Sequence, residues 1–443
     1  MNFSEGTETM AEQKYTISDI IETYISGDWG NDEPTEDASC PVSCIRGADI
    51  VPIYNSEYDN IPLRYISEKS LSNRALQEGD IVIEKSGGSP TQSTGRVVYI
   101  SKELLEEKQD IVCSNFCAAF RIKPEWDAKY VYYYLQHIYD AGVFFNFEGK
   151  TSGLKNLIMD TAFKSITIKK IAIETQRSIA TVLSMIESKM AANRAINHYL
   201  EAMTKQLYDY WFVQFDFPDA NGKPYKSSGG KMVWNEKLKR DIPEGWDGKF
   251  IKDIANTYSG GTPQSSKREF YENGNIPWIN SGELNNPIIT NTCNYITTLG
   301  LDNSSAKLYP QNTILVAMYG ATAGKVSLLT FEACSNQAIC GVMPREENLM
   351  NYLYCFLSSL YNHFIKISTG SARDNISQDI VRNTLIPIPS KDILNRYAKV
   401  SDNLLKKVVR NQKELELLEQ QRDELLSLLM TGQVSVKQLN NDL

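Results

Sequence analysis

Apolar residues recur at alternating steps of three and four in two long stretches of the chain. In the second stretch the repeat runs through Leu404, Val408, Asn411, Leu415, Leu418, Arg422, Leu425 and Leu429. A seven-residue repeat of this kind predicts a long helix that packs along a coiled-coil seam. At roughly 1.5 Å per residue, a helix of about 40 residues is on the order of 60 Å long.

The residues before each long helix follow a different pattern. Short apolar runs alternate there with Gly, Pro and Asn, which is typical of strands joined by turns. Strands are expected at residues 80–84, 96–100, 111–122, 312–318 and 325–331. The pattern therefore predicts α+β domains made mostly of strands and loops, each followed by a long helix.

An internal repeat relates the two halves of the chain. Residues 17–27 match residues 251–261 at six positions with an offset of 234. Further matches follow in the same order, and they pair 79–83 with 312–316, 95–97 with 324–326, 114–115 with 335–336, and 130–135 with 352–357. The offset falls to 219 late in each half. A duplication with loop insertions produces this behaviour.

The offset of 219 transfers the seam of the second helix to the first. The transferred seam runs through Met185, Lys189, Ala192, Ile196, Tyr199, Met203, Gln206 and Tyr210. The simplest geometry is an antiparallel coiled coil with pseudo-two-fold symmetry, in which polar seam residues specify the register. The pairing residues would be Met185, Ile196, Tyr199, Met203, Leu404, Val408, Leu415, Leu418 and Leu425. The alternative is that each helix packs only on its own domain.

These elements divide the chain into six segments. The expected segments are a first globular domain at 1–172, a long helix at 173–213, a linker at 214–245, a second globular domain at 246–391, a second long helix at 392–430 and a tail at 431–443. An aromatic cluster at 211–217 ends the first helix. The Gly, Ser and Lys residues that follow it predict a mobile connection.

Composition places the chain among ordinary globular proteins. Its 443 residues are 42% hydrophobic and 23% charged, with a net charge of -8. The first 60 residues hold thirteen acidic and two basic side chains, so the remainder is slightly basic and a nucleic-acid partner is not excluded. The sequence has no apolar run of membrane-spanning length and a polar, acidic start, so we expect a cytoplasmic protein without a membrane span or signal peptide. The eight cysteines are expected to be reduced thiols.

Motifs for catalysis are weak. Residues 320–326, GATAGKV, resemble a phosphate-binding loop but have three residues between the glycines instead of four, and Val326 replaces the hydroxyl residue. Cys40 with Cys44 and Cys113 with Cys117 have metal-like spacing, but buried thiols are favoured because no histidine is near. The sequence therefore predicts no catalytic residue, metal site or cofactor site in this chain.

Polar loops at matching places in both halves are the candidate binding sites. Gly-rich backbone, hydroxyls and cations suit phosphates, whereas Gln, Asn, Arg and Lys can read base edges. Solvated turns are the alternative interpretation. The candidate residues are Lys85, Ser86, Gly87, Gly88, Thr91, Gln92, Arg96, Lys150, Lys155 and Asn156 in the first half, and Gly260, Gly261, Thr262, Tyr319, Thr322, Lys325, Ser371, Arg373 and Asn375 in the second.

Three short motifs and the order of the elements carry a resemblance to a known family. The motifs are YDYWFVQFD at 208–216, IPEGW at 242–246 and NQA at 336–338. Together with two diverged α+β domains, each followed by a long helix, they resemble the specificity subunit of type I restriction-modification enzymes. The first domain departs from this pattern, since it lacks the Gly-Trp opening, and Ser114-Asn115-Phe116 lacks the Gln of Asn336-Gln337.

The resemblance implies a non-catalytic subunit that binds double-stranded DNA. Each globular domain would be a target recognition domain for one half of a bipartite, asymmetric site, and the paired helices would fix the gap. Two methyltransferase subunits would dock on the helices, and restriction or translocase subunits would join them in defence against phage. S-adenosylmethionine, ATP and Mg²⁺ would be bound only by those partners, which would methylate adenine or cleave DNA.

Two other classes of protein stay open at this point. The acidic first 60 residues fit a coiled-coil scaffold with two protein- or glycan-binding domains, which DNA or heparin would not retain. A degenerate nuclease or methyltransferase acting alone would instead bind a cofactor or Mg²⁺ as the isolated chain.

Overall fold

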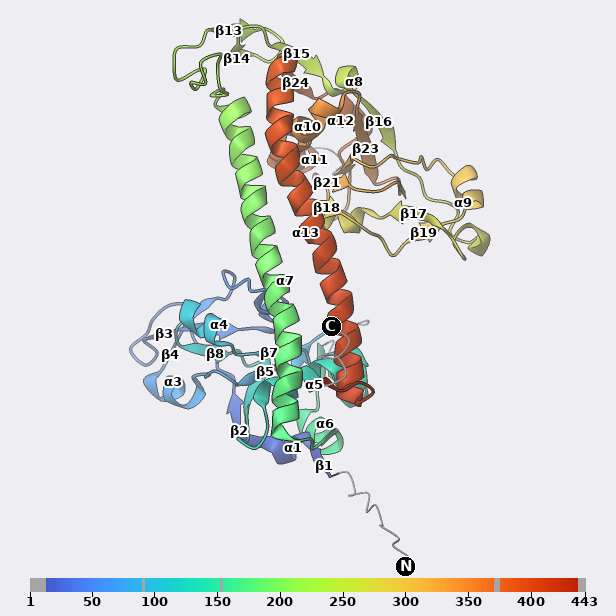
Figure 1. Cartoon of the computed structure of the whole chain (residues 1–443). Helices are drawn as coiled ribbons and strands as arrows, with labels where there is room; N and C mark the ends of the chain where they lie inside the picture. The colour runs from blue at the N-terminus through green and yellow to red at the C-terminus, as the bar shows by residue number, and fades with distance from the viewer. Residues whose placement is uncertain (1–12, 90–91, 152–153, 370–374, 437–443) are drawn as a thin grey trace, which may run out of the picture. The chain divides into compact units, whose positions relative to one another are not determined.

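The computed structural model describes residues 13–89, 92–151, 154–369 and 375–436 (Figure 1). The chain forms two compact units, one of residues 1–192 together with 417–443 and the other of residues 193–416. Both units mix helices and strands, which confirms the predicted α+β fold. Among the described residues, no helix has the length and apolarity needed to cross a membrane.

The first unit is built on a four-stranded antiparallel sheet in the order β2-β9-β5-β7. A three-stranded sheet, β4-β3-β8, a second one, β10-β11-β6, and the pair β1-β12 complete its strands. The strands are β1 Lys14–Thr16, β2 Ile21–Ser26, β3 Cys40–Ile45, β4 Leu63–Ile66, β5 Ile81–Glu84, β6 Ser86–Gly87, β7 Val97–Tyr99, β8 Ile111–Cys113, β9 Cys117–Ile122, β10 Glu148–Thr151, β11 Leu154–Leu157 and β12 Thr167–Lys169.

The helix α5, Ala128–Asp140, provides much of the core of this unit. Asp127 caps it, because its side chain accepts a hydrogen bond from the backbone N–H of Tyr130 at 2.8 Å. Its buried face, which includes Tyr133, packs in one cluster with Phe120 of the central sheet. The shorter helices are α1 Ile17–Ile20, α2 Ile50–Tyr54, α3 Glu68–Arg74, α4 Lys102–Glu107 and α6 Met159–Ser165.

The second unit repeats this arrangement. Its main sheet has the order β16-β23-β20-β21-β18, beside the sheet β19-β17-β22 and the pairs β15-β24 and β13-β14. The strands are β13 Met232–Asn235, β14 Arg240–Pro243, β15 Asp247–Phe250, β16 Ala255–Ser259, β17 Ile276–Ile279, β18 Ile288–Ile289, β19 Tyr295–Ile296, β20 Thr313–Ala317, β21 Val326–Leu329, β22 Cys334–Ser335, β23 Ile339–Pro344 and β24 Leu385–Ile388. The shorter helices are α8 Ile251–Ile254, α9 Thr298–Asp302, α10 Met350–Ser359, α11 Tyr361–Thr369 and α12 Gln378–Arg382.

Strand register corrects two details of the sequence repeat. The strand expected at 111–122 is divided into β8 and β9 by a turn at 114–116. In the first unit Ile83 pairs with Ala118, and in the second Val316 pairs with Cys340. This register gives an offset of 222 at the turn, one residue more than the sequence match of 114–115 with 335–336. The sequence comparison aligned the identical dipeptides Ser114-Asn115 and Ser335-Asn336. In the backbone, however, Ser114 occupies the position of Asn336.

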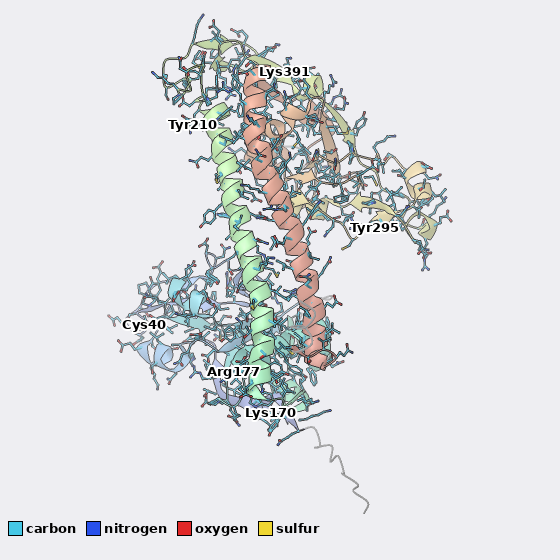
Figure 2. All side chains as sticks on the ribbon, in the orientation of Figure 1. Cys40, Lys170, Arg177, Tyr210, Tyr295 and Lys391 are labelled. Atoms are coloured by element: carbon cyan, nitrogen blue, oxygen red, sulfur yellow. The ribbon has the colours of Figure 1, made fainter. Side chains whose placement is uncertain are left out.

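Two long helices run antiparallel within each unit. They are α7, Ile173–Tyr208, which continues into a π-helical turn at Asp209–Val213, and α13, Lys391–Thr431. In the first unit Leu183, near the start of α7, shares a core cluster with Leu429 at the end of α13. In the second unit the end of α7 meets the start of α13, as Tyr210 and Lys391 mark in Figure 2. Both helices expected from the heptad pattern are therefore present.

The seam of α13 is as expected, but that of α7 is not. Along α13, Val408, Asn411, Leu415, Leu418 and Leu429 are buried, and Leu404, Arg422 and Leu425 are half-buried. On α7 the four predicted apolar pairing residues are exposed by roughly half to two thirds: Met185 67%, Ile196 47%, Tyr199 68% and Met203 53%.

The residues of α7 that do pack lie one position further along the chain. They are Ile186, Met190, Asn193, Asn197, Leu200, Thr204, Leu207 and Trp211, all buried or half-buried. The correct offset between the two helices is thus 218, so Asn193 on α7 is equivalent to Asn411 on α13. A one-residue error turns the assigned face by about 100°, since an α-helix has 3.6 residues per turn.

The segment between the first long helix and the second domain is packed, where a mobile connection was expected. Phe217 stacks on Tyr225 with ring centroids 4.7 Å apart and on Trp246 at 5.3 Å. The carboxylate of Asp216 accepts hydrogen bonds from the backbone N–H of Ser227 at 2.7 Å and from its hydroxyl at 2.6 Å. Aromatic burial outweighs the Gly and Ser content that suggested flexibility.

Candidate nucleic-acid interface

The two candidate loops of the first unit lie side by side. β11 pairs with β6, so that Lys155 is opposite Gly87 and Asn156 is opposite Ser86. The hydroxyl of Ser86 donates a hydrogen bond to Oδ1 of Asn156. Residues 70 positions apart therefore form one polar surface, and the structure brings together the two loops that the sequence suggested separately.

Lys85 is a cation of this surface that is available to a ligand. Its backbone is fixed at both ends, because its N–H donates to the carbonyl of Phe116 at 2.8 Å and its carbonyl accepts from Leu157 at 2.7 Å. Its side chain is half-buried and has no ion-pair partner among the described residues. A cation held at its base and unpaired at its tip suits a phosphate contact.

Arg96 is a structural residue, which corrects its assignment as a DNA contact. Its guanidinium donates to both carboxylate oxygens of Glu84, at 2.8 Å and 2.7 Å, and this hydrogen bonding raises the pKa of Arg96. Glu84 is 2% exposed. A Cβ on Gly87 would lie 2.4 Å from the same carboxylate, so Gly87 is needed for packing. A buried carboxylate requires a partner, and Arg96 supplies it.

Lys155 is also used within the fold. Its ammonium lies 3.1 Å from Oε2 of Glu148 and 4.8 Å from the ring centre of Phe145, and it donates to the carbonyl of Gln92 at 3.3 Å. Glu148 in turn accepts from the backbone N–H of Thr94 at 2.7 Å. Lys155 thus ties the two loops together and is not a free cation.

The remaining candidates of the first-unit loops and of residues 371–375 in the second unit have three outcomes. Gly88, Gln92 and Asn375 are exposed, and Lys150 is known only through its backbone, which pairs opposite Lys155. Thr91, Ser371 and Arg373 lie outside the described residues.

In the second unit a carboxamide joins two of the candidate loops. The hydroxyl of Thr262 donates to Oε1 of Gln337. Gln337 also hydrogen-bonds the phenol of Tyr319, whose pKa is raised by burial and lowered by this bond. Gln337 is exposed, so the three residues form a polar cluster at the surface. The sequence assigned Thr262 and Tyr319 to the site, and Gln337 was noted only as part of a family motif.

Gly260 and Gly261 are explained by close packing. A Cβ on Gly260 would lie 2.1 Å from the carbonyl oxygen of Asn336, and one on Gly261 would lie 2.3 Å from the backbone nitrogen of Ala306. The N–H of Gly261 donates to the carbonyl of Ser335 at 2.8 Å. The N–H of Gly260 also donates, to the carbonyl of Ile339 at 3.0 Å, so neither backbone amide is free for a phosphate.

Two further candidates of the second unit are corrected. Thr322 is 4% exposed, and the ammonium of Lys325 donates to Oδ1 of Asn285 at 2.5 Å. Both lie in the turn of the hairpin between β20 and β21, so the segment leads into a strand. A phosphate-binding loop leads into a helix, and residues 320–326 are therefore a hairpin turn.

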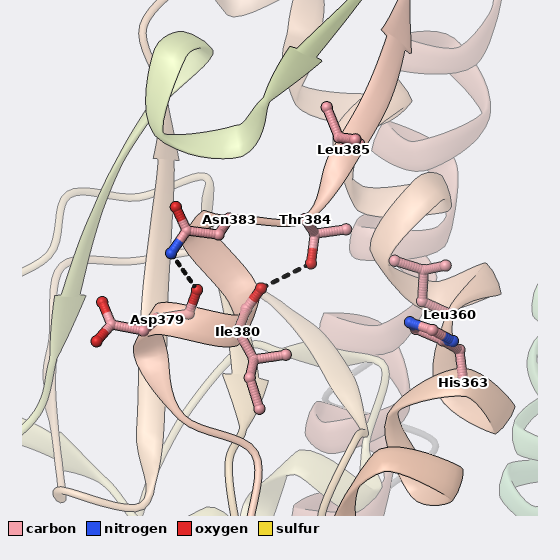
Figure 3. A pocket seen from close by; sticks show the side chains of 7 residues that line it. All are labelled: Leu360, His363, Asp379, Ile380, Asn383, Thr384 and Leu385. Carbon is pink, nitrogen blue, oxygen red and sulfur yellow. Dashed lines mark hydrogen bonds between the residues drawn. The ribbon is translucent and has the colours of Figure 1, made fainter. Parts of the chain in front are cut away.

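None of the candidate residues lines the hollow shown in Figure 3. Its volume is about 710 Å³, and it is lined by Leu360, His363, Asp379, Ile380, Asn383, Thr384 and Leu385. Two of its polar side chains already bond within the chain: the amide of Asn383 donates to the carbonyl oxygen of Asp379 at 2.9 Å, and the hydroxyl of Thr384 donates to the carbonyl oxygen of Ile380 at 2.8 Å.

Three of the four cysteines of the first unit, Cys44, Cys113 and Cys117, are buried thiols, whereas Cys40 is half-buried. Burial raises the pKa of Cys44 to about 12 and that of Cys117 to about 11. Within the described residues no group of three or more His, Cys, Asp or Glu side chains could hold a metal ion. Desolvation disfavours the thiolate that a metal or an electrophile needs.

Comparisons with known proteins agree with this geometry. The family model described as the type I restriction modification DNA specificity domain matches residues 13–202 and 243–420. The chain is 26% identical over 404 residues to the type I restriction enzyme MjaIX specificity subunit of Methanocaldococcus jannaschii, with 89% of this chain and 88% of that protein covered. It is 26% identical over 313 residues to the HindI specificity subunit of Haemophilus influenzae, with 59% and 67% covered.

A solved structure shares the fold. The S subunit of a type I restriction-modification system from M. genitalium superposes with a TM-score of 0.58 at 15% identity, covering 95% of this chain and 96% of that one. The family model alone spans most of the chain, once in each half. The chain therefore belongs to the family of type I restriction-modification DNA specificity subunits.

Proposed function

We propose that this chain is the non-catalytic DNA-reading subunit of a type I restriction-modification complex. Each unit binds one half of a bipartite, asymmetric site in double-stranded DNA. The bound chain directs adenine methylation, or restriction, by partner subunits. The observation that carries the proposal is that two units of the same topology each place a polar loop cluster beside equivalent strands, β5 and β9 in one and β20 and β23 in the other.

The long helices supply the spacing in this proposal. α13 has 41 residues, and a helix of that length spans about 60 Å at 1.5 Å per residue. A pair of packed helices bends little, so two readers attached to them recognise half-sites at a fixed separation. Inserting one heptad into both helices should widen the recognised gap, and an unchanged gap would remove this role.

Partner subunits provide the chemistry that the proposal requires. Two methyltransferase subunits bind S-adenosylmethionine and the flipped adenine, and restriction or translocase subunits bind ATP and Mg²⁺. In this chain the described residues supply polar loops, which suit contacts with DNA.

Methylation mapping tests the proposal most directly. The chain is purified with the methyltransferase subunit of its own genome, and methylated adenines are mapped with and without this gene. We expect one split motif that disappears on deletion. An unchanged methylation map with no DNA retention by the purified complex would instead support a scaffold with two protein- or glycan-binding domains.

A further inference from the structure

One turn is built alike in both units and borders the candidate loops. It follows β8 at 114–116 and β22 at 336–338. The N–H of Ser114 donates to the carbonyl of Ile45 at 2.8 Å, and the N–H of Asn336 donates to the carbonyl of Ile279 at 3.0 Å. A hydrogen bond then closes each turn. The N–H of Cys117 donates to the carbonyl of Ser114 at 2.9 Å, and the N–H of Ile339 donates to the carbonyl of Asn336 at 3.3 Å. The two backbones are therefore equivalent, residue by residue.

A glycine from a neighbouring strand end holds each turn in place. A Cβ on Gly27 would lie 2.0 Å from the carbonyl oxygen of Ser114, and a Cβ on Gly260 would lie 2.1 Å from that of Asn336. A side chain at either position would therefore clash with the turn, so both positions require glycine. The turn is a rigid platform in both units, and only its side chains differ.

Carboxamides occupy the same position of both platforms. Asn115 and Gln337 are equivalent, and both are exposed. The next position differs, because Phe116 is 58% exposed in the first unit whereas Ala338 is buried in the second. The sequence match had placed Asn115 against Asn336, which hid this equivalence.

Both platforms adjoin the loops proposed to face DNA. The carbonyl of Phe116 accepts from the N–H groups of Lys85 at 2.8 Å and Ser86 at 3.1 Å. The carbonyl of Ala338 accepts from Met318, next to Tyr319, at 2.7 Å. A ligand that contacts Lys85 thus also meets the turn beside it.

Gln337 is held in one orientation before any ligand arrives. Its oxygen accepts from the hydroxyl of Thr262, so its amide group is the side of the carboxamide that can donate to the bonded phenol of Tyr319. A carboxamide has two acceptor lone pairs and two donor hydrogens, so one of each remains after these bonds. That pair matches the N6 donor and N7 acceptor of adenine in the major groove.

We propose that Asn115 and Gln337 are the adenine-reading residues of the two half-sites. Each places its carboxamide on the major-groove edge of one A·T pair. Phe116 contacts the methyl group of a thymine beside the first of these adenines, which gives its exposed ring an apolar partner. The inference rests on the proposed function and deepens it, since it names the bases and the side chains that read them.

Selection of bound duplexes by the full-length chain in its methyltransferase complex tests the inference. Asn115→Ala and Gln337→Ala should each lose preference for one A·T pair, in different half-sites, by about 5- to 150-fold. The other half-site should be selected as before. The matched controls are two other exposed carboxamides of the same units, Asn73→Ala in α3 and Asn303→Ala directly after α9, which should leave selection unchanged.

Modified bases assign the contacted atoms. Replacing the selected adenine by 7-deazaadenine removes N7, so the affinity of the parent should fall. The corresponding alanine variant already lacks the contact, so the same base change should not lower its affinity further. Replacing the neighbouring thymine by uracil should weaken the parent but not Phe116→Ala. Thermal unfolding of each variant establishes that it is folded.

Three results would overturn the inference. One is unchanged base preference in both carboxamide variants. Another is an affinity loss equal on all sequences with a salt slope shallower by about one, which would mark a phosphate contact. A third is additive loss from 7-deazaadenine and the alanine variant. A parent complex that selects no sequence at all would instead count against the proposed function.

Discussion

Arg96 and Glu84 form a bidentate ion pair in the interior of the first unit, with nitrogen–oxygen distances of 2.8 Å and 2.7 Å. The carboxylate is 3% exposed and the guanidinium side chain 18%. We expect Arg96→Ala to lower the free energy of unfolding by about 3 to 5 kcal/mol, because it leaves a buried charge without a partner. Urea denaturation measures this loss.

A double variant separates this pair from a DNA contact. Removing both charges with Glu84→Ala and Arg96→Ala should restore part of the stability lost in Arg96→Ala, since no charge is then left unpaired. Stability that is unaffected by Arg96→Ala, together with weaker DNA binding, would return Arg96 to the interface.

For Lys85 we expect the opposite result, a loss of DNA affinity without a loss of stability. Lys85→Ala should leave the urea midpoint unchanged and lower DNA affinity, with the slope of log K against log salt reduced by about one. The matched control is Lys164→Ala, which removes an exposed cation in the last turn of α6, outside the candidate loops. Equal salt slopes for the parent and Lys85→Ala would show that Lys85 makes no phosphate contact.

The corrected seam predicts a sharp contrast along α7. Leu183 is fully buried and Met185, two residues later, is 67% exposed. We expect Leu183→Ala to lower the free energy of unfolding by about 2 to 5 kcal/mol and Met185→Ala to change it by less than about 0.5 kcal/mol. Comparable losses from both variants would restore the seam first derived from the repeat.

The burial of Glu187 on α7 should make the first unit more stable in acid than at neutral pH. Burial raises its pKa above the usual 4.5, although hydrogen bonds from Tyr133 and Tyr54 and the charges of Lys129 and Arg422 oppose the shift. The Tyr133 hydroxyl donates to Oε2 of Glu187 at 2.5 Å.

The pH dependence follows from the sign of this shift. The folded state holds the proton more tightly than the unfolded state, so the contribution of Glu187 to stability is complete below pH 4.5 and declines as pH rises through the raised pKa. Glu187→Gln should abolish this decline, so its stability relative to the parent should increase from pH 4.5 upward. Parallel stability curves for parent and variant, measured by urea unfolding across pH, would contradict the assignment.

The sequence predicted the polar loops better than their individual roles. Lys85 and Arg96 look equivalent in a Gly- and Ser-rich loop, yet one is unpaired among the described residues and the other neutralises Glu84. Glu84 follows three buried apolar residues of β5 and carries no sign in the sequence that it is buried as well. Whether a cation is free depends on contacts between residues distant along the chain.

Sequence periodicity by itself determined the two long helices, the duplication and the α+β class, because these depend on local spacing that a few substitutions do not erase. Only the tertiary structure decided which face of α7 packs and that Asn115 stands where Gln337 does. Both questions turn on an offset of one residue, and in diverged repeats chance identities can shift an alignment by that amount. Hydrogen-bond register and side-chain packing cannot shift so freely, since a slip of one residue would expose buried apolar side chains and leave backbone groups unpaired.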